Sequence, residues 1–196
     1  MDYNPFKKPI SELSNLKPSK GRLLISEPFM SDPNFQRSVI LITEYNNEGI
    51  MGFILNHPLP FKIEDVLEDF PKFAALLYEG GPVSGDQLFF IHNQGNKIED
   101  SIEITDDVYW SGDISQLKGM IHNKEISPSD VKFFLGYSGW DKAQLDRELK
   151  SNSWFVQEAN PSIVFDNDLD LWKKVVENSS KEISIMAKFP LDPKLN

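Results

Sequence analysis

The chain has 196 residues, a formal net charge of −10 and no cysteine, a size typical of one domain. The missing cysteines exclude disulfides, thiolate metal ligands and cysteine nucleophiles. No apolar run reaches the roughly 18 residues of a membrane span, and the N-terminus lacks the apolar centre of a signal peptide, so we expect a cytoplasmic protein without a membrane segment.

The first part of the chain predicts a polar extension followed by strands. Residues 1–20 are rich in proline and lysine, and "ISELSNL" (10–16) predicts a short docking helix from apolar residues three apart. The domain itself is expected over 21–196. Strands are predicted at 21–26, 38–45 and 50–56, with a turn at Asp32-Pro33-Asn34 and a hairpin turn at 46–49.

A helix and a glycine corner are predicted next. Apolar residues at i, i+3, i+4 and i+7 predict a helix over 63–70, ended by Pro71. Residues 76–94 read as two strands separated by Gly80-Gly81. A double glycine before a proline indicates a sharp bend or a close backbone crossing.

Helices and strands are mixed in the second half of the chain. Asp113 is predicted to be the N-cap of a helix over 114–122. The last predicted helix has Leu169, Trp172 and Val176 on its buried side. The other predictions are strands at 101–110, 131–137 and 153–159, and helices at 141–150 and 167–179. Without a regular βαβ alternation, the predicted fold class is α+β, a single domain with a mixed, largely antiparallel sheet and helices packed around it.

The stretch "GYSGW" (136–140) raises the question of a serine nucleophile at Ser138. A nucleophile elbow reads G-x-S-x-G on a strand-to-helix turn, but here Trp140 stands where a glycine is required. All three histidines precede Ser138, unlike the chain order of that fold. The alternative is a structural corner, in which the glycines allow a turn and Asp141 caps the next helix.

No other motif predicts catalysis, a metal or a cofactor. The histidines lack the i, i+4 spacing of zinc sites, and no phosphate loop follows the double glycine. We therefore assign no catalytic, cofactor-binding or metal residue and expect no cofactor. The acidic balance and the missing basic recognition helix argue against direct nucleic-acid binding.

Several stretches, in the same order, resemble the YqgE/AlgH family over residues 21–196. They are "GRLLISEPFMSDPNFQRSVILITEYNNEGIMGFILNHP", "EGGPVSGDQLFFIH", "FFLGYSGWDKAQLDREL" with "SW" following, and "PLDPKLN". The resemblance implies a bacterial, cytoplasmic α+β protein of uncharacterised activity that carries a transcriptional-regulator label. It supplies no catalytic residue or cofactor. The residues that match its motifs are Asp32, Pro33, Phe35, Arg37, Gly52, Asn56, Gly80, Gly81, Pro82, Gly136, Tyr137, Trp140, Gln144 and Leu145.

The function expected from these observations is a non-catalytic binding or regulatory domain. Its partner would be an unidentified protein or small-molecule ligand, and the sequence does not indicate an oligomeric state. The candidate recognition surface is Asp32, Arg37 and Asn56, because polar groups on loops over a rigid scaffold often bind. The alternative function is a serine hydrolase that uses Ser138.

Overall fold

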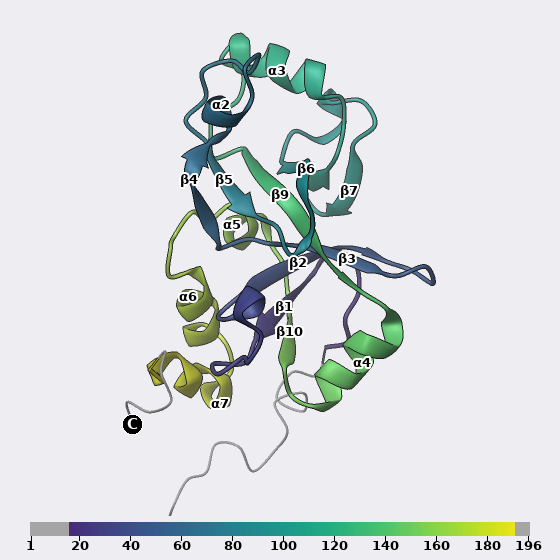
Figure 1. The fold of residues 1–196 in the computed structure, drawn as a ribbon, viewed down its shortest axis with the longest axis vertical. Helices are drawn as coiled ribbons and strands as arrows, with labels where there is room; N and C mark the ends of the chain where they lie inside the picture. The colour runs from purple at the N-terminus through teal and green to yellow at the C-terminus, as the bar shows by residue number, and fades with distance from the viewer. Residues whose placement is uncertain (1–15, 191–196) are drawn as a thin grey trace, which may run out of the picture.

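The computed structural model describes residues 16–190, and its ten strands form one curled sheet (Figure 1). Along the main path the strand order is β10-β1-β2-β3-β9-β6-β8-β7, and β4 and β5 join through β9. All pairings are antiparallel except β5 with β9. The strands are β1 (Arg22–Ser26), β2 (Val39–Tyr45), β3 (Ile50–Ile54), β4 (Pro58–Lys62), β5 (Leu76–Glu79), β6 (Val83–His92), β7 (Ile102–Thr105), β8 (Val108–Trp110), β9 (Val131–Trp140) and β10 (Trp154–Glu158).

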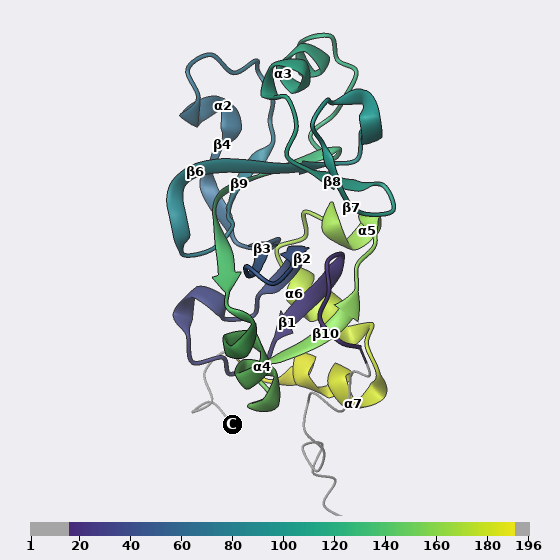
Figure 2. The same cartoon turned by 90° about the vertical axis from the view of Figure 1, so that its right-hand side faces the viewer.

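Six α-helices cover the described sheet and confirm the α+β fold class. They are α2 (Ile63–Val66), α3 (Ile114–His122), α4 (Lys142–Lys150), α5 (Pro161–Val164), α6 (Leu171–Glu177) and α7 (Lys181–Ser184). Figure 2 shows α2 and α3 at one end of the molecule and α4, α6 and α7 at the other. No helix in residues 16–190 is both long and apolar enough to cross a bilayer.

The first strands are apolar throughout because both of their faces are covered. In β1, Leu23 and Ile25 belong to a core cluster that includes Trp172 of α6. Leu24 points the other way, into a cluster with Leu145 of α4. Side chains alternate along a strand, so a strand between two helical layers needs apolar residues at every position.

The ten-residue strand β9 connects the two ends of the molecule. Its first half pairs with β5 and β6, and its last residues pair with β3, where Trp140 lies opposite Ile50. The backbone continues as a strand to Trp140, so the predicted turn after residue 137 is wrong. The predicted cap is confirmed, because the Asp141 carboxylate accepts a hydrogen bond from the Gln144 N–H at 2.7 Å.

The double glycine marks a close crossing of two backbones, as its sequence predicts. A Cβ at Gly80 would lie 2.2 Å from the carbonyl oxygen of Gly136. Gly136 itself has φ +68°, and a Cβ there would lie 2.7 Å from the carbonyl oxygen of Gly81. Only glycine fits both positions.

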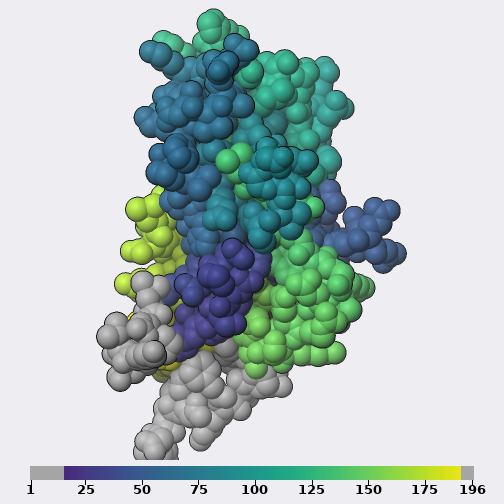
Figure 3. All heavy atoms as spheres, viewed as in Figure 1, coloured from purple at the N-terminus to yellow at the C-terminus, as the bar shows by residue number. Residues whose placement is uncertain are grey.

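The surface hairpin and most first-half predictions agree with the structure. The β2–β3 hairpin projects from the body of the molecule (Figure 3), and the Asn46 N–H donates to the Gly49 carbonyl at its tip. Asp32 caps a 3₁₀ turn at Pro33–Phe35. The predicted 10–16 helix lies outside the described residues except for Leu16, which is not helical.

Several predicted boundaries are wrong. The helix predicted over 63–70 is only Ile63–Val66, because Phe70 and Phe73 turn inward to pack edge-on against Phe133. The strand predicted over 101–110 is a hairpin of β7 and β8. Strand β4, which contains prolines and pairs with β5 alone among the described strands, was not predicted.

The C-terminal helix prediction needs correction as well. Helix α6 begins at Leu171 rather than at 167, and α5, α7 and a 3₁₀ turn at Ile185–Lys188 were not predicted. Trp172 and Val176 are buried, but Leu169 lies in the preceding loop and is 71% exposed. A loop over 166–170 forms because the Asp166 and Asp168 carboxylates each accept a hydrogen bond from a backbone N–H two residues later.

Candidate functional site

Ser138 is a buried residue of β9 with a structural hydrogen bond. Its side chain is fully inaccessible, and its hydroxyl donates to the Gly80 carbonyl at 3.0 Å. The hydroxyl proton is therefore directed at a backbone oxygen in the glycine crossing. This arrangement offers a substrate no access to the oxygen, so Ser138 has a structural role, although the turn predicted at this position is replaced by a continuous strand.

One serine–histidine pair lies elsewhere, between Ser101 and His92. The Ser101 hydroxyl lies 3.0 Å from Nε2 of His92, but Nδ1 accepts the Gln94 N–H at 3.2 Å. The Nε2 proton then faces the Ser111 carbonyl at 3.2 Å. Because its lone pair is occupied at Nδ1, this imidazole cannot accept the serine proton as a general base would.

The pair of Ser38 and His57 is similar. Their side chains are 3.3 Å apart, but the same Nε2 also faces the Gln36 carbonyl at 3.2 Å, which requires a proton on that nitrogen. Burial lowers the pKa of both His57 and His92, which favours the neutral form of each ring. We interpret both pairs as internal hydrogen bonds of the scaffold.

The structure brings Arg37 and Asn56 together, and it places the Asp32 hydrogen bond within a separate turn. The Asn56 amide donates to the Arg37 carbonyl at 2.8 Å and accepts from the Val39 N–H at 2.9 Å. The Arg37 guanidinium lies 4.8 Å from the centre of the Trp172 ring and donates to the Phe189 carbonyl.

These contacts link β2 to the C-terminal helices. They show what Arg37 and Asn56 do inside the fold, while the recognition surface predicted for Asp32, Arg37 and Asn56 stays a prediction. Asp32 uses its carboxylate to accept the Asn34 N–H at 3.0 Å.

Lys132 is a buried cation that the sequence analysis did not single out. Its side chain is 2% exposed, and its ammonium donates to the carbonyls of Leu55 at 3.0 Å and Asp166 at 2.5 Å. Burial lowers the pKa of Lys132 to about 7. Burial, together with the Asp166 charge, raises the pKa of the neighbouring Tyr78 to about 12. The sequence did contain a signal for this residue, because Lys132 stands inside the otherwise apolar run "VKFFL". Lysine is rarely fully buried, so a lysine in such a run is unusual.

Glu148 of α4 holds together the tryptophans of the GYSGW and SW motifs. One carboxylate oxygen accepts the indole N–H groups of Trp140 at 2.9 Å and Trp154 at 2.7 Å. The other oxygen accepts the side-chain amide of Gln144 at 2.9 Å. This single acidic residue joins the end of β9, helix α4 and the start of β10.

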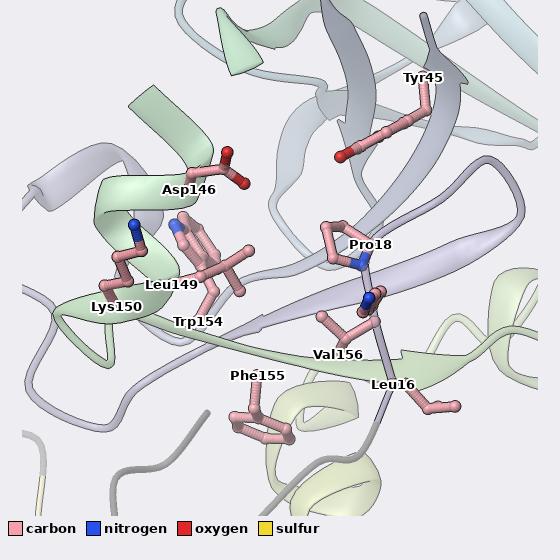
Figure 4. Close-up of a pocket in the computed structure, with 10 residues that line it drawn as sticks. Leu16, Pro18, Tyr45, Asp146, Leu149, Lys150, Trp154, Phe155 and Val156 are labelled. Carbon is pink, nitrogen blue, oxygen red and sulfur yellow. The ribbon is translucent and has the colours of Figure 1, made fainter. Parts of the chain in front are cut away.

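Beside this cluster lies an open hollow of about 540 Å³, here called the α4 groove (Figure 4). Apolar residues make most of its wall, and β10, the strand that begins the sheet path, runs along it. The volume is within the range of small-molecule sites. The lining residues are Leu16, Lys17, Pro18, Tyr45, Asp146, Leu149, Lys150, Trp154, Phe155 and Val156.

Polar groups stand at the rim of the α4 groove. In Figure 4 the Tyr45 hydroxyl and the Asp146 carboxylate point toward the space between them from opposite sides. Lys17, Asp146 and Lys150 are exposed, and none of them takes part in the ion pairs of the described chain. This site was not predicted, because Tyr45 and Asp146 are about a hundred residues apart and only the fold places them together.

A second hollow of about 430 Å³ lies beside α6, but its charges are already paired. Its wall includes Asp166 and Lys174, which form an ion pair with each other. Within residues 16–190, no three His, Asp or Glu side chains are grouped closely enough to hold a metal ion. The α4 groove is therefore the better candidate for ligand binding.

A sequence model of the AlgH-like family, DUF179, matches residues 23–184. The chain belongs to this family. UPF0301 proteins from Cytophaga hutchinsonii and Parabacteroides distasonis are 40% and 41% identical to it, over 91% and 93% of this chain and 99% and 94% of their own lengths.

Two solved structures are similar to this chain. The solution structure of the AlgH protein from Pseudomonas aeruginosa matches with a TM-score of 0.67 and 28% identity, over 89% of this chain and 98% of that one. A crystal structure of a protein from Corynebacterium diphtheriae matches with a TM-score of 0.78 over 94% of this chain and all of that one. At 23% identity, the second match supports the fold alone.

Proposed function

We propose that this AlgH-like chain is a non-catalytic, cytoplasmic binding domain that acts in regulation by holding a ligand or partner segment in the α4 groove. The observation that carries the proposal is the groove itself, which combines an apolar wall with rim charges that lack ion-pair partners in the described chain. Such a combination is typical of binding sites.

The arrangement of the serines supports binding rather than hydrolysis. Ser138 is buried, and the imidazole beside Ser101 has its lone pair occupied by a backbone N–H. Direct contact with DNA is not part of the proposal, because the chain carries a net charge of −10. A regulator of this kind would act through another protein or a small effector.

The proposal is tested by NMR with ¹⁵N-labelled protein and a library of small fragments. We expect shift changes at Tyr45, Leu149 and Lys150, and no turnover of generic ester, phosphate or peptide substrates. Reproducible turnover, or a DNA gel shift that weakens steeply with salt, would contradict the proposal. Cell fractionation tests the proposed location.

The hydrolase alternative has its own measurement. A serine-directed fluorophosphonate should leave Ser138 unlabelled, and Ser138→Ala should lower the free energy of unfolding by only about 0.5 to 1.5 kcal/mol. The cost is small because the Gly80 carbonyl also accepts the Ile54 N–H at 3.1 Å. A covalent adduct on Ser138 would support the serine-hydrolase alternative.

A further inference from the structure

The α4 groove follows an outer edge of the sheet. Strand β10 stands at one end of the sheet path and pairs with β1 alone among the described strands. Two neighbouring residues of β10, Trp154 and Phe155, both line the groove, although their side chains belong to core clusters on opposite faces of the sheet. A hollow that touches both faces passes over the edge between them. The groove therefore offers room for a further stretch of chain beside β10.

The backbone of β10 supplies polar groups on this side. The Ser26 N–H donates to the Ser38 carbonyl at 3.0 Å, so Ser26 directs its backbone groups toward β2 and away from β10. The residue paired with Ser26 across the ladder is Trp154, whose backbone N–H and C=O therefore face away from β1. A peptide along this edge can exchange hydrogen bonds with such groups, so a peptide fits the groove better than a purely apolar ligand does.

The sequence places a suitable segment directly before the groove. Leu16, the first described residue, lines the groove and packs against the core cluster that contains Trp154. The preceding stretch "ISELSN" (10–15) carries Ile10 and Leu13, which continue the three-residue spacing of Leu16. Six extended residues span up to roughly 20 Å, and the five residues of β10 span about 17 Å. The segment is long enough to follow the whole edge.

Charge and attachment both favour this segment over a free peptide. The Asp146 carboxylate points into the space of the groove in Figure 4 and takes part in none of the ion pairs of the described chain. Lys7 and Lys8 stand just before the apolar stretch and would complement this carboxylate. A segment attached at the groove also has an effective concentration on the order of millimolar, so weak contacts are enough to keep it bound.

We propose that residues 10–15 lie along the outer edge of β10 in the α4 groove of their own chain, with Ile10 and Leu13 on its apolar wall. The inference rests on the proposed function and adds its regulation, because a ligand or partner segment must displace residues 10–15 before it can bind. The N-terminal segment is thus an autoinhibitory element of the binding domain.

The test measures how close the segment lies to the groove. Because the chain has no cysteine, a nitroxide can be attached at one chosen position. On Ser11→Cys the nitroxide should broaden the NMR signals of Leu149, Lys150 and Trp154. On Glu125→Cys, an exposed position after α3 at the other end of the molecule, it should leave these signals sharp (Figure 2). A mixture of ¹⁵N-labelled natural protein with ¹⁴N protein carrying the Ser11→Cys nitroxide should show no broadening.

Matched substitutions test which contacts hold the segment. In the Ser11→Cys background, Leu13→Ser should lower the ratio of docked to undocked segment about tenfold or more, because a buried leucine is lost. Leu169→Ser removes a leucine that is 71% exposed and should leave the ratio unchanged. Asp146→Lys should lower the ratio about two- to fivefold, and less at high salt. Glu177→Lys makes the same charge change on α6 and should have no effect. Thermal unfolding checks that each variant keeps its fold.

The outcomes separate this inference from the proposed function. If the Ser11→Cys nitroxide leaves the groove signals sharp, or if Leu13→Ser and Leu169→Ser behave alike, the inference is wrong, while library fragments that bind the groove still support the proposed function. Broadening in the mixture would show that the segment docks on a second copy, which also overturns the inference. If the nitroxide broadens the signals as expected but no fragment binds the natural protein or Leu13→Ser, the inference stands and the proposed function fails. If both are right, fragments should bind Leu13→Ser more tightly than the natural protein.

Discussion

Lys132→Met removes a buried cation whose titration should control how stability depends on pH. The pKa of Lys132 is about 7 in the folded protein and 10.5 in an ordinary environment. Between these values the unfolded chain binds one proton more than the folded chain, so the free energy of unfolding rises with pH. Below about pH 7 both states are protonated, and this contribution is constant.

The size of the change in unfolding free energy follows from the single proton that Lys132 binds or releases. A difference of one bound proton corresponds to roughly 1.4 kcal/mol per pH unit, so the stability should increase by about 2 to 3 kcal/mol between about pH 7.5 and pH 9.5. Tyr78 does not interfere in this window, because its pKa is raised to about 12. Urea unfolding followed by tryptophan fluorescence measures the increase.

The comparison between variants decides the argument. In Lys132→Met the free energy of unfolding should be nearly independent of pH between about pH 7.5 and pH 9.5, since the titrating group is gone. The variant also loses the hydrogen bonds to the carbonyls of Leu55 and Asp166, so its stability at any one pH can differ from that of the natural protein. Lys72→Met, at an exposed lysine, should keep the slope of the natural protein. The reasoning would be refuted if the unfolding free energy of the natural protein did not change with pH over this window, or if Lys132→Met kept the same increase.

Three further predictions concern Glu148 beside the α4 groove, Gly136 inside β9 and Gly119 inside α3. Glu148→Gln should lower the free energy of unfolding by about 1 to 3 kcal/mol, because a charged acceptor shared by Trp140 and Trp154 is lost. Gly136→Ala should lower it by about 2 to 5 kcal/mol through left-handed strain and a clash with the crossing backbone. Gly119→Ala, inside α3 with open space around it, should instead raise it by about 0.5 to 1 kcal/mol.

These predictions have controls in the same chain. Glu177 forms only an exposed pair with Lys173 at 3.9 Å, so Glu177→Gln should change the unfolding free energy by less than about 0.5 kcal/mol. Gly85 has no atom near its Cβ position, and Gly85→Ala should be tolerated. Equal costs for Glu148→Gln and Glu177→Gln, or for the alanine variants of Gly136 and Gly85, would contradict the contact-based explanation.

Local patterns in the sequence predicted much of the fold. Asp113 and Asp141 cap the helices that they were expected to cap, since the cap depends on neighbours two or three residues away. The apolar runs around Leu24 and Ile40 became central strands. The crossing at Gly80-Gly81 was also readable, because the close approach of two backbones demands glycine.

Interactions between distant segments decided the rest. The helix predicted from residue 63 stops early because Phe70 and Phe73 gain more by packing on Phe133 than by continuing a helix. The GYSGW motif predicted a strand, a corner and a helix, yet only the fold showed that its strand runs on to Trp140.

The sequence by itself determined the α+β class, the helix caps, the need for a double glycine at residues 80–81 and the resemblance to a family, because each can be recognised from short local patterns along the chain. The tertiary structure alone decided the burial of Lys132, the role of Glu148 and the α4 groove. The groove wall joins Leu16 and Tyr45 to a helix a hundred residues later. No local sequence pattern predicts that these distant segments lie side by side, since their proximity results from how the whole sheet curls and where α4 packs on it.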